Sequence, residues 1–165
     1  MLIVAFGVLG FVGLQARTAV VNVEGSQRAQ ALILAEDMAS RLRDASRADA
    51  PNFVAASTDY IEGAQPSQVC PTGAAAREVC EWGKLIRGAS ELQGTTAAGS
   101  IRNARGCIQQ LAPDTYLVAI FWEGVQASAD APLRCQYNGN DFPTSLYGTN
   151  LRRGVSVVVR KGVLS

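Results

Sequence analysis

MLIVAFGVLGFVGL, the stretch Met1–Leu14, holds fourteen residues without a charge or a strongly polar group. A pattern typical of an amphipathic helix follows it, and no proline interrupts the chain before Pro51. One helix from the start of the sequence to about Arg47 would be roughly 65–70 Å long at 1.5 Å per residue. A domain of 165 residues cannot cover a helix of that length. About half of it therefore needs another environment.

The second half of the predicted helix has one apolar face. Small and apolar residues recur there at steps of three and four, which puts them on one side of a helix, with charged residues largely on the others. The apolar set is Ala29, Leu32, Ala35, Met38, Ala39 and Leu42, and the charged set is Arg28, Glu36, Asp37, Arg41 and Arg43. This half is the natural cover for a sheet.

Three interpretations compete for the first half. A secretory signal peptide needs a basic n-region and a small-residue cleavage site, and neither is present. A buried core helix is the second interpretation. The third is a membrane helix whose first turns precede Met1, because fourteen residues span only about 21 Å of a roughly 30 Å hydrocarbon core.

We favour the membrane helix, because three glycines at a spacing of three form a smooth strip that another backbone can approach. The positions that we predict to face lipid or neighbouring helices are Leu2, Ile3, Val4, Phe6, Gly7, Leu9, Gly10, Phe11, Gly13 and Leu14.

Two motifs in this region carry a family resemblance. Gly7–Gln15 reads GVLGFVGLQ and ends a run rich in Leu and Val; Ala31–Arg43 reads ALILAEDMASRLR. They resemble the G-L-x-G-x-x-G-L-Q and A-x-x-L-A-x-D-M-A-x-R-x-R motifs of type IV pilins, more narrowly of PilV-type minor pilins, the type IV pilus modification proteins. Arg41 and Arg43 hold the two arginine positions of the second motif. The prepilin-peptidase motif of that family should lie just before Met1 and is absent. Either the sequence starts late, which the short apolar span favours, or cleavage and N-methylation do not apply.

The resemblance covers the first fifty residues well and implies a minor pilin. Such a protein is a single-pass protein of the bacterial inner membrane before assembly, with a periplasmic head, and then part of the extracellular pilus. It would prime filament assembly near the tip and support twitching motility and adhesion. Implied partners are other minor pilins and the major pilin through the N-terminal helix, a tip adhesin and the inner-membrane assembly platform. The alternative is a pseudopilin of a type II secretion system.

The four cysteines, an even number, suggest two disulfides and a periplasmic or extracellular domain. Their spacing leaves three connectivities open, of which we predict Cys70–Cys80 and Cys107–Cys135. Each bridge would contribute roughly 3–4 kcal/mol in the chain-entropy treatment. Structural zinc is the rival interpretation, but no pair has a C-x-x-C or C-x₄-C spacing and the chain has no histidine. We expect neither a metal nor a cofactor.

The amino-acid composition limits the size of the domain and the classes of function that the chain can have. At 165 residues and 48% hydrophobic, the chain can form one domain with a sizeable core. A net charge of +1 with scattered arginines gives no electrostatic case for a specific nucleic-acid contact. The absence of histidine removes the commonest general base and metal ligand.

Two further hypotheses come from other classes. A membrane-anchored periplasmic enzyme would use a carboxylate pair, either Glu36–Asp37 or Glu78–Glu81. Neither has a nucleophile, metal ligands or a glycine loop beside it, and we read the second as a solvated helix face, so we predict no enzyme. A sugar- or DNA-binding module would use Tyr137, Tyr147, Arg152 and Arg153, which we interpret as surface residues of strands and loops.

The chain divides into an apolar half of the helix, 1–25, and a globular head, 26–165. In the head we expect the rest of the helix at 26–47, an αβ-loop with a small helix at 48–106, and a sheet at 107–165. Turn signals make Asp49–Pro71 irregular. Helical spacing predicts a helix over 73–92, with Trp82 in the core, and Gln93–Gly106 reads as a loop.

Three strands are predicted in the last third of the chain, at Cys107–Leu111, Thr115–Trp122 and Arg152–Lys161. The middle one is apolar on both faces, which places it in the centre of a covered sheet. In the last, Val155, Val157 and Val159 face inward. Tyr137–Asn140 reads as a hairpin turn. The expected class is α+β: a pilin fold, with a long N-terminal helix on a three- to four-stranded antiparallel sheet, a variable αβ-loop and a disulfide-bounded C-terminal region.

Overall fold

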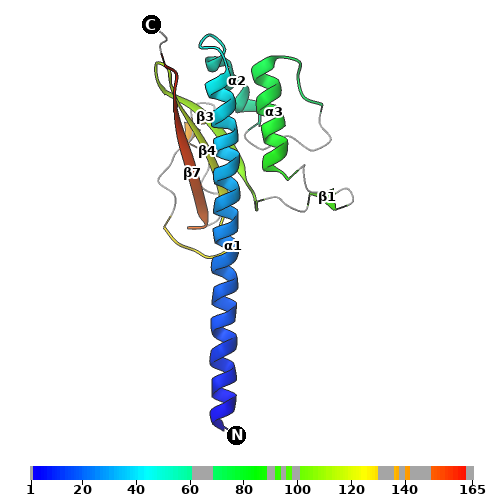
Figure 1. The fold of residues 1–165 in the computed structure, drawn as a ribbon, viewed down its shortest axis with the longest axis vertical. Helices are drawn as coiled ribbons and strands as arrows, with labels where there is room; N and C mark the ends of the chain where they lie inside the picture. Colours follow the sequence, from blue (N-terminus) through cyan, green and yellow to red (C-terminus); the bar gives the residue numbers. More distant parts are fainter. Residues whose placement is uncertain are drawn as a thin grey trace.

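The computed structural model describes residues 2–60, 69–88, 92–93, 96–97, 101–129, 136–137, 140–141 and 150–162. Over these ranges the chain is α+β, with one long helix, two shorter helices and a three-stranded antiparallel sheet (Figure 1). The helices are α1 (Leu2–Asp44), α2 (Ala50–Tyr60) and α3 (Ala74–Ile86), and the sheet strands are β3 (Arg105–Ala112), β4 (Thr115–Glu123) and β7 (Arg152–Arg160). Two pairs of two-residue strands complete the description: β1 (Leu92–Gln93) with β2 (Thr96–Ala97), and β5 (Gln136–Tyr137) with β6 (Asn140–Asp141).

The long N-terminal helix is confirmed. α1 has 43 residues, which corresponds to about 64 Å at 1.5 Å per residue. It ends at Asp44 rather than near Arg47. Figure 1 shows its C-terminal half beside the sheet and its N-terminal half projecting from the head.

The buried face of α1 is narrower than the sequence pattern predicted. Four of the six predicted positions are fully buried, namely Ala35, Met38, Ala39 and Leu42, and so is Ala31, which the predicted set did not include. Leu32 is 47% exposed and Ala29 is exposed as well. At about 100° per residue these two side chains point to one side of the strip that contacts the sheet. The assignment of both to the buried face was therefore wrong.

The sheet has the order β3-β4-β7, with β4 in the centre. Its register pairs Cys107 with Ala119, and Ala119 with Ser156. Every β4 residue after Thr115 is buried, which confirms a central strand covered on both faces. On β7, Val159 is buried and Val158 is exposed, and Val155 and Val157 pack against the core, so the predicted inward face is confirmed.

Residues 50–60 form α2, so the prediction of an irregular segment over Asp49–Pro71 was wrong there. In the turn just before α2, Ser46 Oγ donates to Asp49 Oδ2 (2.7 Å) and accepts from the Asp49 backbone N–H (3.1 Å). Pro51 is tolerated because the first turn of a helix has no internal acceptor for its missing N–H. Phe53 then lies buried in the core.

The helix predicted over 73–92 is confirmed at Ala74–Ile86. Its Trp82 is buried, as expected for a core residue, and its indole Nε1 donates to the Leu34 carbonyl of α1 at 2.8 Å. The indole ring lies against Gly106 of β3. Arg105 and Gly106 are strand residues, and residues 92–93 pair with 96–97, so the loop prediction for 93–106 was wrong at 93, 96–97 and 105–106. The helix prediction was likewise wrong at Leu92.

The hairpin predicted at Tyr137–Asn140 is supported by the backbone, because Tyr137 and Asn140 are antiparallel partners. The two residues between them lie outside the described part of the chain.

Candidate interaction surface on the projecting helix

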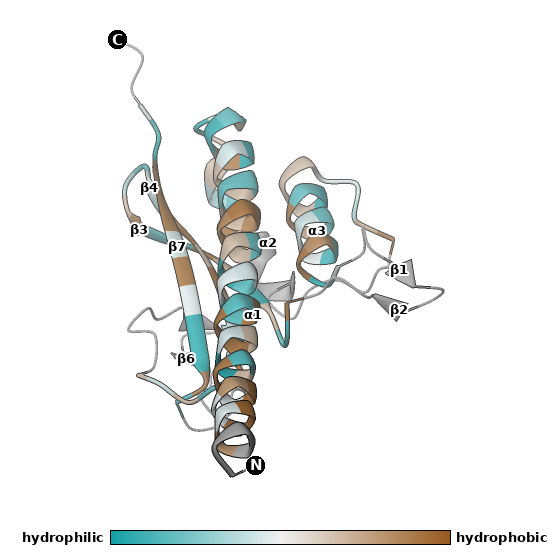
Figure 2. Cartoon of the chain, turned by 60° about the horizontal axis from the view of Figure 1, so that its bottom comes forward, coloured by the Kyte–Doolittle hydropathy of each residue, from teal (hydrophilic) through white to brown (hydrophobic). Residues whose placement is uncertain are grey.

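The N-terminal half of α1 presents a largely apolar surface to solvent, interrupted by Gln15, Arg17, Thr18 and Asn22. Residues 6–19 are all exposed, and Figure 2 shows this part of the helix to be largely hydrophobic. The exposed fractions of its large side chains are 72% for Phe6, 68% for Leu9, 61% for Phe11 and 68% for Leu14. Leu2, Ile3 and Val4 belong to the same helix, but their side chains lie outside the description. An apolar surface of this extent marks contact with lipid or with another protein.

Gly7, Gly10 and Gly13 have no packing role against the residues that the structure describes. A Cβ atom placed on any of them would meet no other atom within 4 Å. Glycine destabilises a helix in water by about 1 kcal/mol relative to alanine. The close approach that these glycines permit must therefore be to something outside the described chain.

Among the described residues, α1 is the one helix whose length and composition would allow it to cross a membrane. Core helices of soluble proteins pass the same test, but they are mostly buried, and none of the apolar window of α1 is buried by the rest of the chain. The interpretation of Met1–Leu14 as a buried core helix is therefore wrong for the described residues.

Among the described residues, Glu24 is the first of α1 to hydrogen-bond to the head. Its Oε1 accepts from the backbone N–H groups of Val125 (3.1 Å) and Gln126 (3.2 Å). The same oxygen lies 3.6 Å from Nη2 of Arg153. We therefore call residues 6–23 the projecting part of the helix, because the contacts with the head begin at Glu24.

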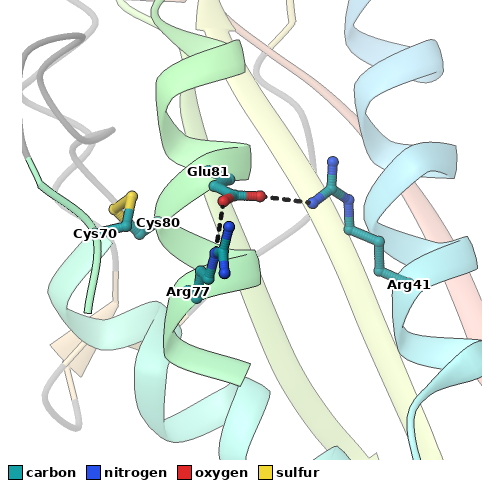
Figure 3. Close-up of a disulfide and its surroundings, with 5 residues drawn as sticks. All are labelled: Arg41, Cys70, Arg77, Cys80 and Glu81. Atoms are coloured by element: carbon teal, nitrogen blue, oxygen red, sulfur yellow. Dashed lines mark hydrogen bonds and ion pairs between the residues drawn. A yellow bond between two sulfur atoms is a disulfide. The ribbon is translucent and has the colours of Figure 1, made fainter. Parts of the chain in front are cut away.

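The predicted Cys70–Cys80 disulfide is confirmed (Figure 3), with the two Cα atoms 5.6 Å apart. It joins the segment before α3 to the middle of that helix, and Cys80 is fully buried. Cys107 is also disulfide-bonded. The remaining cysteine, Cys135, lies outside the described residues, so the Cys107–Cys135 pairing stays a prediction.

Beside this disulfide, Arg41 connects α1 to α3. Its Nε lies 2.9 Å from Asp37, Nη1 bonds Glu78, and Glu81 lies 3.9 Å away. Arg77 pairs with Glu81 from the other side, as Figure 3 shows. The description of Glu78–Glu81 as an ordinary solvated face was therefore wrong. Both carboxylates are partly exposed, but they belong to a network that joins two helices.

The other carboxylate pair is also engaged with arginines. Asp37 pairs with Arg41, and Glu36 lies 3.5 Å from Arg43. The described residues include no group of three or more His, Cys, Asp or Glu side chains placed to hold a metal ion.

The four residues considered for sugar or DNA binding do not form a described surface. Arg152 is buried, with its guanidinium 5.7 Å from the centre of the Phe121 ring. Arg153 is mostly buried and faces Glu24. The interpretation of these two arginines as surface residues was wrong. The side chain of Tyr137, and all of Tyr147, lie outside the described residues.

Comparisons of the chain with known protein families, with curated proteins and with solved structures found no match.

Proposed function

We propose that this chain is a minor pilin of the PilV type, a subunit of a type IV pilus. One observation supports the proposal above the others: half of a 43-residue helix is apolar and exposed, while its other half is covered by a sheet. The resemblance of Gly7–Gln15 and Ala31–Arg43 to the pilin motifs adds to it. A long helix on a three-stranded antiparallel sheet is the arrangement that a pilin fold requires.

The proposed mechanism is an exchange of apolar environments. Residues 6–23 lie in the inner membrane before assembly, with the head in the periplasm. During assembly the same residues move into a bundle of pilin helices in the filament. The apolar surface is shielded from water in both places, so the transfer needs no large change in hydrophobic free energy. The glycines allow neighbouring helices to approach closely in the bundle.

The partners in this proposal follow from the same helix. They are other minor pilins and the major pilin, which contribute similar helices, together with the inner-membrane assembly platform and a tip adhesin. The subunit primes filament assembly near the tip, and through the filament it supports twitching motility and adhesion. No catalytic step is part of the proposal.

The experiment that tests this function is complementation of a deletion strain. Three genes are returned: the unaltered gene, Phe11→Lys and Val158→Lys. Phe11 and Val158 are both exposed apolar residues, 61% and 55%, but the first is on the projecting helix and the second on the head. A lysine in the middle of a membrane helix costs about 2.5–3.5 kcal/mol.

We expect deletion to reduce surface filaments, and Val158→Lys to restore them while Phe11→Lys does not. Immunoblots of membrane fractions verify that each protein is made. Normal filaments in the deletion strain would contradict the proposal. If filaments are normal and type II secretion is lost, the chain is a pseudopilin instead.

A further inference from the structure

β7 runs alongside the C-terminal half of α1 in the same direction, and charged groups bind it to the helix at both ends. At its lower end, in the view of Figure 1, Arg153 faces Glu24. The same carboxylate accepts hydrogen bonds from the backbone N–H groups of Val125 and Gln126, in the segment that follows β4. We call this set of contacts the lower clamp.

The upper clamp is formed by Lys161, the residue after β7. Its ammonium group donates to the α1 carbonyl of Leu42 (2.9 Å), to that of Arg43 (2.8 Å), and to that of Ala45 just beyond the helix. These carbonyls have no partner within the helix, and the negative end of the helix dipole favours a cation there. The backbone N–H of Lys161 donates to the Asp114 carbonyl at 2.9 Å, and the Asp114 carboxylate pairs with Arg47.

The strand and the helix span the same distance between the two clamps. From Arg153 to Lys161 a strand covers about 26 Å at 3.3 Å per residue. From Glu24 to Leu42 a helix covers about 27 Å at 1.5 Å per residue. The extended strand is therefore just long enough for Arg153 and Lys161 to contact the helix at the same time. Between them the contact is apolar: Val155, Val157 and Val159 belong to or pack against the core that contains Ala31 and Ala35.

The described residues nearest the two chain ends lie far apart, with Leu2 at the start of the projecting helix and Gly162 just after β7 (Figure 1). A pull that separates the two ends therefore slides α1 and β7 past each other. In that direction both clamps and the apolar contact carry the load together, whereas a peeling force would break them one after another.

We propose that β7 with its two clamps is a load-bearing strap, which transmits an axial pull on α1 to the head without letting the head detach from the helix. The strap is a property of this chain alone. Its use in a filament under tension rests on the proposed pilin function.

The test is single-molecule stretching of the full-length chain, held in a detergent micelle, with handles on its two ends and oxidised disulfides. Glu24→Ala removes the lower clamp and Lys161→Met removes the upper one. Glu36→Ala is the matched control, because it removes an exposed carboxylate of α1 whose partner, Arg43, is on the same helix. Circular dichroism verifies that each variant is folded, and Lys161→Arg retains donors at the upper clamp.

We expect Glu24→Ala and Lys161→Met each to raise the rate of the first rupture at constant force at least about tenfold, since each removes hydrogen bonds to a charged group. Glu36→Ala should change it less than about twofold, and Lys161→Arg should retain part of the resistance. Rupture rates of Glu24→Ala and Lys161→Met equal to that of Glu36→Ala would overturn the strap. Loss of filaments on gene deletion tests the pilin function separately, so either proposal can fail alone.

Discussion

Gly106 is the position where the packing of the head can be tested most sharply. A Cβ atom at this residue would lie 2.4 and 2.5 Å from two carbons of the Trp82 ring and 2.6 Å from Cδ1 of Ile86. Ordinary contacts between carbon atoms are about 3.5–4.0 Å, so Gly106→Ala requires α3 or β3 to move by about 1 Å.

The Trp82 ring cannot yield without further loss. It is 2% exposed, and its Nε1 donates to the Leu34 carbonyl at 2.8 Å. Overpacking of this kind costs about 1–3 kcal/mol, and a lost hydrogen bond adds about 1 kcal/mol. We therefore expect Gly106→Ala to reduce the free energy of unfolding by about 2–4 kcal/mol, a large part of the 5–15 kcal/mol typical of a domain.

The assay is urea unfolding of the full-length chain in mild detergent, followed by tryptophan fluorescence, because Trp82 and Trp122 are the only tryptophans. Gly25→Ala is the control: a Cβ there meets no atom within 4 Å, so alanine should leave stability unchanged or raise it by up to about 1 kcal/mol. The double variant Gly106→Ala/Trp82→Phe should lose at least about 1 kcal/mol less than the sum of the losses of the two single variants. A Gly106→Ala protein as stable as the unaltered chain would refute this account of the α3–β3 contact.

Three further outcomes are expected. Hydrogen bonding to Arg47 holds the pKa of Asp114 below its ordinary value of 3.8. The stabilisation by this pair is therefore complete above about pH 5 and is lost as the pH falls through the lowered pKa. Asp114→Asn should flatten that part of the curve of unfolding free energy against pH, and an unchanged curve would contradict the pairing. Replacing Cys70 and Cys80 together by serine should cost about 3 kcal/mol in urea unfolding, and peptide mapping of the unreduced protein should recover the two cysteines in one linked fragment, not apart. Arg41→Met should cost about 1 kcal/mol because it breaks the partly exposed network between α1 and α3, whereas Arg43→Met should cost less than about 0.5 kcal/mol; equal costs would argue against the network.

The main elements of the fold could be predicted because their patterns are strong. Steps of three and four residues located α1 and α3, and a strand with two apolar faces located β4 in the centre of the sheet. α2 was missed because Pro51 and the neighbouring polar residues resemble a turn. The signal that would have found it is the pair Ser46 and Asp49, which has the spacing of a capping box.

The contacts that hold the head to α1 could not be predicted from sequence. Glu24 and Val125 are 101 residues apart, and Lys161 and Leu42 are 119 apart, so only the folded chain brings them together. The burial of Arg152 also depends on the folded chain. The alternation along β7 puts its side chain on the outward face, but there the guanidinium packs over the ring of Phe121 on β4. By contrast, the exposure of the apolar half of α1 could be predicted, because the helix is too long for the head to cover.

Residues 6–23 of the projecting helix need an environment other than water. Flotation of the purified full-length protein with phosphatidylethanolamine–phosphatidylglycerol vesicles, after removal of detergent, tests this requirement most directly, with a chain that begins at Glu24 as the comparison. We predict that the full-length protein floats with the vesicles and that the shortened chain stays in the aqueous fraction. A full-length protein that remains in the aqueous fraction as a monomer would contradict the account.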